Sequence, residues 1–270
     1  MQAWRVTVAA ADEDLATAAL WEAGTVGAEV RPLPGDRVEI LAYFEGDGPP
    51  ALEGLVPGAS VAPAEVPQVD WVGRFREGFR SFRAGRFLVA PEWDAPASPS
   101  SDVLLVDPGR AFGTGTHETT RLCLGALEEL ALRRPLGRTL DLGAGTALLA
   151  IAASRLGASP VVASDIDPEA ATASSTHARL NRARVGVVRA NGGRGFQPRA
   201  FDLVLANLMA LLLVDRSVEI RSLLAPGAAL VLSGLLLEDV PFVREAFADC
   251  GTPEERTLGE WAALVYEGRP

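Results

Sequence analysis

Hydrophobic and polar residues alternate in two different ways along the chain. From residue 1 to about residue 66 the apolar runs are short, and their spacing changes between the two-residue period of strands and the wider period of a helix. Strands are expected at 4–8, 26–31, 38–44 and 60–66, with a helix at 12–23 and a short apolar piece at 51–55. The order strand, helix, strand, strand, short helix, strand predicts a small α+β domain of the ferredoxin-like kind.

From about residue 104 onward, apolar runs of a few residues alternate with longer amphipathic stretches. Strands are expected at 103–106, 139–142, 161–164, 185–189, 201–206, 229–232 and 261–266, and helices at 119–133, 147–156, 168–181, 208–224 and 240–250. Strands that alternate with helices indicate βαβ units with parallel strands. This part of the chain is therefore predicted to be an α/β domain with a doubly wound, mainly parallel, Rossmann-like sheet.

The segment between these two parts is rich in arginine and phenylalanine. Residues 74–87 contain five arginines and four phenylalanines, a composition also found on surfaces that bind single-stranded nucleic acid. Trp71, Phe75, Phe79 and Phe82 are spaced by four, four and three residues, so a helix would place them on one face. We therefore favour an amphipathic connecting helix. The predicted organisation is an α+β domain at 1–66, a linker helix at 67–87 and the α/β domain at 88–270.

Composition and charge narrow the range of partners. No apolar run in the 270 residues reaches the ~18 residues of a membrane span. All 25 basic residues are arginines, and with 35 acidic residues they give a net charge of −10 at pH 7. Duplex-binding proteins usually carry the opposite charge, so direct nucleic-acid binding is not expected, whereas a basic protein would suit an acidic surface. The start of the chain lacks a basic signal region, so a cytoplasmic enzyme is the default expectation.

Chemistry-bearing residues gather where the predicted strands end. In Asp141-Leu142-Gly143-Ala144-Gly145, the two glycines allow a sharp turn and a close approach of the backbone to a ligand. The dinucleotide fingerprint GxGxxG fails because its sixth position is Leu148. The form DxGxG instead resembles the nucleoside-binding turn of class I S-adenosylmethionine-dependent methyltransferases. Glycine-rich turns between a strand and a helix also occur without any ligand.

Two carboxylates follow the next predicted strand. Asp165 comes 24 residues after Asp141, close to the ~20 residues expected for the acid that binds ribose hydroxyls in such folds. A carboxylate accepts two hydrogen bonds from a vicinal diol, which suits a ribose. The alternative is that Asp165 or Asp167 only caps the helix that begins at Pro168. We assign the cap to Asp167 and the ribose to Asp165, because Asp165 is nearer the end of the strand.

The most specific motif is DPGRAFGTGTHETT at residues 107–120. It closely resembles the DPGxAFGTGxHxTT signature of the PrmA family, the bacterial methyltransferases of ribosomal protein L11. The ANL motif of that family is matched by Ala206-Asn207-Leu208 at the end of the strand expected at 201–206, and residues 233–235 and 259–261 resemble its C-terminal part. The resemblance is good over about 70–270 and extends to the N-terminal part in size and pattern only.

The resemblance implies that S-adenosylmethionine is the cofactor and gives roles to individual residues. Thr120 would contact the methionyl end of the cofactor from a helix N-terminus, and Gly143 and Gly145 would form the turn beneath it. Asp165 would bind the ribose, and Asn207 would lie beside the sulfonium and the incoming amine. The N-terminal domain would recognise ribosomal protein L11, free or on the large subunit, whose lysine side chains and N-terminal amine are the methyl acceptors.

Two positions depart from the pattern of the PrmA family. Ala147 stands where the family usually has the third glycine of its turn. Ala190-Asn191 replaces a Gly-Ser or Gly-Asp pair, so no residue is assigned to the adenine.

The histidines and cysteines predict no metal site. His117, within the signature, would take a proton or serve as a cap, and His177 is expected on the surface of a helix. Neither histidine has a second histidine or cysteine at ligand spacing, so no catalytic metal is expected. Cys123 and Cys250 are too far apart in sequence to form a CxxC motif.

The proposed chemistry requires a neutral amine. An ammonium group has no lone pair to attack a methyl group, so the site must admit the neutral form or lower the amine's pKa. The Asn207 Oδ1 and a nearby backbone carbonyl would accept the amine's hydrogens and orient its lone pair. Two other hypotheses stay open: a class I methyltransferase for another protein, RNA or small molecule, and a non-catalytic cofactor-binding module, which Ala147 would favour.

Overall fold

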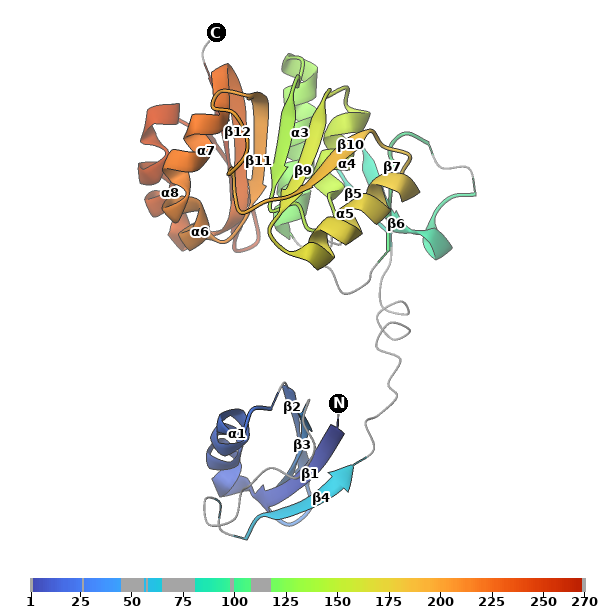
Figure 1. Ribbon diagram of the computed structural model, residues 1–270, viewed down its shortest axis with the longest axis vertical. Helices are drawn as coiled ribbons and strands as arrows, with labels where there is room; N and C mark the ends of the chain where they lie inside the picture. The colour runs from blue at the N-terminus through green and yellow to red at the C-terminus, as the bar shows by residue number, and fades with distance from the viewer. Residues whose placement is uncertain are drawn as a thin grey trace. The chain divides into compact units, whose positions relative to one another are not determined.

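The computed structural model describes residues 2–25, 27–44, 56, 58–64, 81–97, 100–107 and 118–268. The chain divides into two compact units, Met1–Asp70 and Trp71–Pro270 (Figure 1). Most of the predicted linker helix, residues 67–80, and the apolar piece at 51–55 lie outside the described residues and stay predictions. Within the described ranges, no helix has the length and apolar character that crossing a membrane requires.

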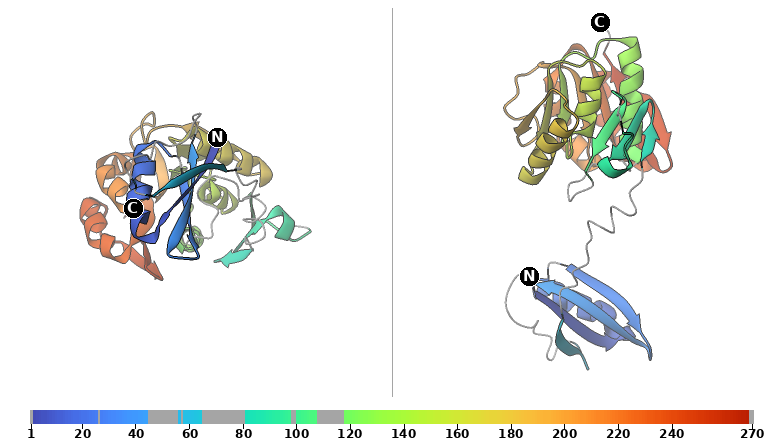
Figure 2. Two further views of the ribbon diagram at one scale, coloured as in Figure 1. Left: turned by 90° about the horizontal axis from the view of Figure 1, so that it is seen from below. Right: turned by 90° about the vertical axis from the view of Figure 1, so that its right-hand side faces the viewer.

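The first unit is a four-stranded antiparallel sheet with a helix against one face (Figures 1 and 2). Its sheet order is β2-β3-β1-β4, and its elements are β1 (Gln2–Ala9), α1 (Glu13–Glu22), β2 (Gly27–Leu33), β3 (Arg37–Phe44) and β4 (Ser60–Ala64). The two-residue period of β1 places Val6 and Val8 on one face, where they pack with Leu20 of α1 and Ile40 of β3 in a buried core. The order of the strands confirms the ferredoxin-like prediction.

The second unit contains a seven-stranded sheet in the order β10-β9-β8-β11-β12-β14-β13. Its strands are β8 (Thr139–Leu142), β9 (Val161–Asp165), β10 (Val185–Arg189), β11 (Phe201–Asn207), β12 (Leu224–Leu236), β13 (Glu254–Leu258) and β14 (Trp261–Glu267). The first five strands in the order are parallel to one another, and β14 runs antiparallel to both of its neighbours, β12 and β13. This arrangement confirms the doubly wound, mainly parallel sheet.

Helices cover both faces of this sheet (Figure 1). They are α3 (Glu118–Arg133), α4 (Leu148–Arg155), α5 (Pro168–Leu180), α6 (Ala210–Asp215), α7 (Ser217–Leu223) and α8 (Val240–Ala246). Successive residues of β11 point to opposite faces, so Leu203 and Leu205 pack in a core with α3 and α4. Val204 and Ala206 face a second core that is completed by α6, α7 and α8.

The end of the predicted linker helix is wrong. Residues 82–84 form a strand, β5, that pairs antiparallel with β6 (Phe87–Pro91), and β6 pairs in parallel with β7 (Val103–Val106). Gly85 makes the turn with a φ of +59°, a conformation that glycine adopts without strain. The helical spacing of the aromatic residues does not extend into this hairpin, where Phe87 is fully buried and the Phe82 ring lies 4.4 Å from the guanidinium carbon of Arg121.

The helix predicted at 208–224 is interrupted. It forms two short helices, α6 and α7, that meet at Arg216, and β12 begins directly after α7. The hydrophobic period continues through Arg216, so periodicity alone does not reveal the break. A further strand, β13, was not predicted because its sequence EERTL is mostly polar.

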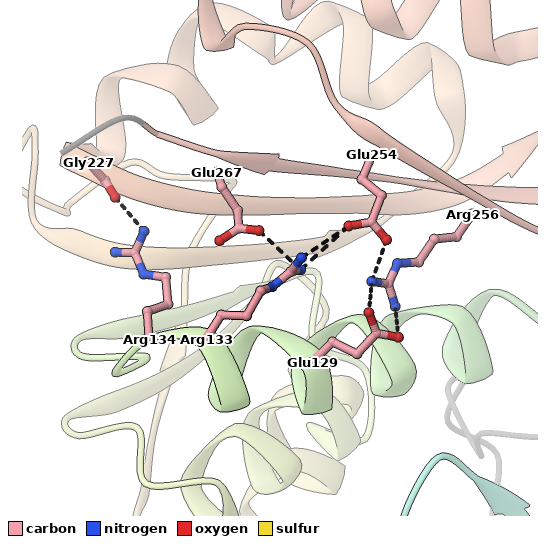
Figure 3. Close-up of polar contacts among 7 residues, drawn as sticks. All are labelled: Glu129, Arg133, Arg134, Gly227, Glu254, Arg256 and Glu267. Carbon is pink, nitrogen blue, oxygen red and sulfur yellow. Dashed lines mark hydrogen bonds and ion pairs between the residues drawn. The ribbon is translucent and has the colours of Figure 1, made fainter.

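Ion pairs hold the hairpin of β13 and β14 against α3 (Figure 3). Arg256 is paired with Glu129 and Glu254, with the closest N···O distance 2.6 Å in each pair. Arg133 lies 3.1 Å from Glu267. The Arg256 side chain is only 13% exposed, so the polar strand β13 is anchored by charge rather than by apolar packing.

Candidate active site

A cavity of about 700 Å³ opens at the carboxyl ends of β8, β9, β10 and β11. The order of the strands reverses between β8 and β11, and such a switch point is where open α/β sheets bind ligands. The volume of the cavity lies within the range of ~300–1,000 Å³ that is typical of small-molecule sites. All the residues predicted to bind the cofactor line this cavity, namely Thr120, Gly143, Gly145, Asp165 and Asn207.

The glycine-rich turn after β8 forms the floor of the cavity. The amides of Gly143 and Ala144 both donate to the Ser164 carbonyl, at 2.8 and 3.0 Å, which ties the turn to the end of β9. Gly143 has a φ of +71°, and a Cβ at this position would lie 2.3 Å from Cδ2 of Leu208. The left-handed backbone therefore favours glycine here, and any larger residue would also have to displace the end of the Leu208 side chain.

Ala147 adopts the conformation that a glycine would adopt more easily. It precedes α4 with a φ of +59° and a ψ of 25°, and its side chain is fully buried in the core beneath that helix. The left-handed conformation costs an L-residue roughly 1–2 kcal/mol relative to the right-handed one. Ala147 therefore has the left-handed backbone expected of the usual glycine, and as an alanine it adopts this backbone with strain.

Asp165 ends β9 and Asp167 precedes α5, and the predicted cap at Asp167 is confirmed. The Asp167 side chain accepts a hydrogen bond from the Glu169 amide at 2.8 Å and caps α5. Asp165 lines the cavity, and its oxygens accept from the amides of Gly145 and Asp167 at 2.9 and 3.0 Å. These two bonds hold the carboxylate in place and leave lone pairs on both oxygens for hydroxyl donors.

Asp141 is a charged residue of the cavity to which the sequence assigned no role. It is buried at the end of β8, and one carboxylate oxygen accepts from the Ala150 amide of α4 at 2.9 Å. Burial raises the pKa of Asp141 to about 7, the Ala150 hydrogen bond opposes that rise, and the charge of Asp165 adds to it. The cavity therefore contains a carboxyl group that titrates near neutral pH.

The end of β11 presents Asn207 to the cavity. The Leu208 amide donates to the Ser233 carbonyl of β12 at 3.0 Å, so the turn after Asn207 is closed by backbone groups. Gly234 makes this possible, because a Cβ there would lie 2.3 Å from the Leu208 oxygen. Among the described residues the Asn207 side chain has no hydrogen-bond partner, which leaves its amide free for a ligand.

The signature motif is described only at its two ends. Residues 108–117, which include His117, lie outside the described residues. At one end Thr120 is buried in the first turn of α3. At the other, the Asp107 amide donates to Nε2 of His177 at 2.9 Å, so the neutral ring carries its proton on Nδ1 and donates to the Ala173 carbonyl. The expectation that His177 lies on the surface is wrong, since it is buried against β7.

Comparison with known proteins decides the family. The profile of the family described as ribosomal protein L11 methyltransferase (PrmA) matches residues 6–268, nearly the whole chain. The chain belongs to this family. The PrmA match includes the N-terminal unit, for which the sequence motifs offered a resemblance in size and pattern only.

Individual PrmA relatives agree with this assignment. A ribosomal protein L11 methyltransferase of Geobacter sulfurreducens is 42% identical over 231 residues, which are 84% of this chain and 75% of that protein. The protein of the same name from Rhizobium leguminosarum bv. trifolii is 36% identical over 257 residues, covering 92% and 85%. The crystal structure of ribosomal protein L11 methylase from Lactobacillus delbrueckii subsp. bulgaricus has a TM-score of 0.63 at 28% identity, covering 71% of this chain and all of that one.

The cavity also contains residues that sequence reasoning missed. Arg216 and Asn191 line it from segments 25 residues apart, and Leu208 and Met209 line it beside Asn207. Arg216 lies at the break between α6 and α7, a break that no sequence signal marked. In the described part of the chain, no group of three or more histidine, cysteine or acidic residues is arranged to hold a metal ion.

Proposed function

We propose that the chain methylates lysine side-chain and N-terminal amines of ribosomal protein L11 with S-adenosylmethionine. The family assignment supports the substrate and the reaction class. The structural observation that carries the proposal is the convergence of Thr120, Gly143, Asp165 and Asn207 on one cavity at the switch point of the sheet. These residues come from four separate segments of the chain, and their convergence supports a ligand-binding site.

The cavity residues fit the cofactor. Asp165 would accept the two ribose hydroxyls, because its carboxylate is already oriented by two backbone amides. The turn at Gly143 and Gly145 would lie beneath the nucleoside, where the absence of a Cβ allows close approach. Thr120 would meet the methionyl end from the first turn of α3, whose N-terminal partial positive charge suits a carboxylate. When bound, S-adenosylmethionine supplies an electrophilic methyl group.

Asn207 is the residue proposed to act on the substrate. Its Oδ1 would accept a hydrogen from the neutral amine and align the nitrogen lone pair with the methyl group. Asparagine is not a base at neutral pH, so the site must take up the amine already deprotonated. A positively charged amine loses its proton more easily beside another positive charge and away from water, which lowers its pKa. Orientation and desolvation would thus account for most of the rate.

The partner is proposed to be the protein itself, free or on the large subunit, and not the ribosomal RNA. A net charge of −10 disfavours direct contact with nucleic acid and suits a basic protein surface. Residues 1–66 contain no histidine and no cysteine, and we assign substrate recognition to the small N-terminal unit. A ribosomal substrate also supports a cytoplasmic location.

Transfer of a tritiated methyl group tests the reaction and its acceptor. Ribosomes from cells that lack the methyltransferase are incubated with the protein, and radioactivity is expected in L11 and absent from the RNA. Label in RNA would instead support the alternative, a class I methyltransferase that acts on RNA. A chain that begins at Gln68 is expected to bind the cofactor and yet leave L11 unlabelled; full labelling would remove the recognition role from the N-terminal unit.

Three variants then test the individual roles. Asp165→Ala is expected to weaken S-adenosylmethionine about tenfold or more, because it removes a charged pair of hydrogen bonds. Asp215→Ala, which removes an exposed charge outside the cavity, is the matched control and should bind normally. Asn207→Ala is expected to lower the single-turnover rate on the order of 100-fold with a much smaller effect on cofactor affinity. A normal single-turnover rate would exclude Asn207 from the reaction.

A further inference from the structure

Large apolar side chains are exposed along the edge of the sheet where the cavity opens. Met209 follows Asn207 by two residues, lines the cavity and is 74% exposed. Leu211, in the first turn of α6, is 86% exposed, and Phe242, in the first turn of α8, is 67% exposed. We call these three residues, together with the exposed Leu237, the apolar shelf.

The topology of the sheet brings the members of the apolar shelf to one place. β11 and β12 are parallel neighbours in which Asn207 is paired with Ser233, so their carboxyl ends lie at the same edge of the sheet. α6 begins shortly after β11, and α8 follows β12 through the short helix η3 (Leu237–Asp239). The two helices pack against each other (Figure 1). Each helix therefore has its first turn at the edge where the cavity opens.

The two helices fill their side of the core with other residues. α6 buries Leu213, and α8 buries Val240 and Val243, in the core on that side of the sheet. The shelf residues are additional to this buried face and contribute little to it, because most of their surface is in contact with solvent. Contiguous exposed apolar surface of this kind typically marks a site where another molecule binds.

The charged residues next to the apolar shelf are acidic. The segments 208–212, 233–242 and 258–261 contain three acidic residues and no arginine. The Leu237 amide donates to the Glu260 carbonyl at 3.0 Å, which holds the turn before β14 beside η3. Asp239 accepts a hydrogen bond from the Leu236 amide at 3.0 Å, whereas Glu238 and Glu260 are exposed. An apolar surface with this acidic border suits a protein segment that carries both apolar and basic side chains.

We propose that the apolar shelf binds the segment of L11 around the methylated amine, and that Glu238 and Glu260 attract basic side chains of that segment. The inference rests on the proposed function, which puts the reacting amine beside Asn207. That nitrogen must come within about 3–3.5 Å of the methyl group, and in lysine only a four-carbon stem joins it to the backbone. The backbone of the acceptor must therefore pass over the opening of the cavity, where Met209 and Leu211 are exposed.

Steady-state methylation of isolated L11 at saturating S-adenosylmethionine tests the apolar shelf. The double variant Leu211→Gln with Phe242→Gln is expected to lower kcat/KM for L11 about tenfold, the effect of losing the burial of one large apolar side chain, while kcat stays near the native value. Leu132→Gln, at an 80% exposed leucine in the last turn of α3, is the matched control and should behave as the native protein. A value of kcat/KM in the double variant that equals the native one would overturn the proposal.

Calorimetry with S-adenosylhomocysteine separates docking from folding. The double variant is expected to bind this ligand with native affinity, because neither residue lines the cavity. A second comparison uses L11 in which the apolar residues next to the methylated lysine are replaced by serine. This substrate should have a lower kcat/KM with the native enzyme and show little further loss with the double variant, since the two changes remove the same contact. Losses that simply add would refute the contact.

The acidic border is tested by its dependence on salt. Glu238→Gln with Glu260→Gln should lower kcat/KM for L11 about threefold at an ionic strength of about 0.01 M and have almost no effect at about 1 M, because salt screens exposed charges. Glu245→Gln, in the last turn of α8, is the control and should have no effect at either ionic strength. A loss that is the same at both ionic strengths would exclude electrostatic attraction by this pair.

The remaining outcomes identify a different occupant or a different failure. If the native protein sediments as a dimer and the shelf double variant as a monomer, the apolar shelf binds a second copy of the chain and the proposal fails. If the native protein does not methylate L11, the proposed function fails. If it methylates L11 and the shelf variants do so equally well, only this inference fails.

Discussion

Replacing Asp141 by asparagine should make the protein more stable, and increasingly so as the pH rises. The carboxyl group is buried near the end of β8 and accepts a hydrogen bond from the Ala150 amide. Burial is the main reason that its pKa rises from 3.8 to about 7. An asparagine of nearly the same shape keeps an oxygen for the Ala150 amide and never carries a charge.

The magnitude follows from the size of the pKa shift. Each unit corresponds to about 1.4 kcal/mol, so three units amount to about 4 kcal/mol. Below pH 4 the carboxyl is protonated in both the folded and the unfolded protein, and its charge costs nothing. Between pH 4 and 7 only the unfolded state loses the proton, so the free energy of unfolding falls as the pH rises. Above pH 7 the buried charge lowers the free energy of unfolding of the native protein by this full amount, and Asp141→Asn carries no such charge.

Urea unfolding of the ligand-free proteins at intervals from pH 4.5 to 8.5 measures this difference. The free energy of unfolding of the variant minus that of the native protein is expected to grow by several kcal/mol across the series. Asp202→Asn is the control: the hydrogen bond from Arg138 lowers the pKa of Asp202 below 3.8, so its stabilising effect is already complete at pH 4.5, and the loss of stability in this variant should stay nearly constant across the series. A difference for Asp141→Asn that stays constant within about 1 kcal/mol over the whole range would refute the reasoning.

Three other changes test the backbone and the loop supports. Ala147→Gly relieves about 1 kcal/mol of backbone strain and removes a buried methyl group that contributes a similar amount to stability. Scanning calorimetry should therefore show a melting temperature within a few degrees of the native value. The affinity for S-adenosylhomocysteine should be equal or better. Gly234→Ala forces its new methyl group against the Leu208 backbone at a position with a positive φ. The variant should lose more than about 2 kcal/mol of unfolding free energy and bind S-adenosylhomocysteine more weakly. An unchanged free energy of unfolding would show that the turn adjusts easily. His177→Leu leaves the Asp107 amide without its acceptor, and urea unfolding should give a loss of about 1–3 kcal/mol.

The sequence allowed the main sheet and the residues at its strand ends to be predicted because both depend on local signals. Gly143 and Gly145 indicate a turn, and Asp165 follows a short apolar run whose length favours a buried strand. The same local reasoning found the core of the first unit, since the alternation around Val6 is short and regular.

What escaped prediction depends on contacts between distant segments. His177 lies in a polar helix pattern, yet it is buried, and its ring accepts a hydrogen bond from the Asp107 amide just after β7. The helix breaks at Arg216, whose side chain donates to Asn191, 25 residues earlier, although the apolar period continues through this position. A one-dimensional pattern contains no information on such pairs, so periodicity predicts the elements and leaves the polar contacts between them undetermined.

Leu208 links two glycines that are 91 residues apart in the chain. Its side chain occupies the space above Gly143, and its backbone occupies the space beside Gly234. Anyone who redesigns this enzyme for a larger or smaller acceptor would change residues around Asn207, and every shift of Leu208 would be felt at both glycines. Libraries at this site should therefore vary the three positions together, because a substitution that is harmful alone becomes acceptable when its neighbour gives way.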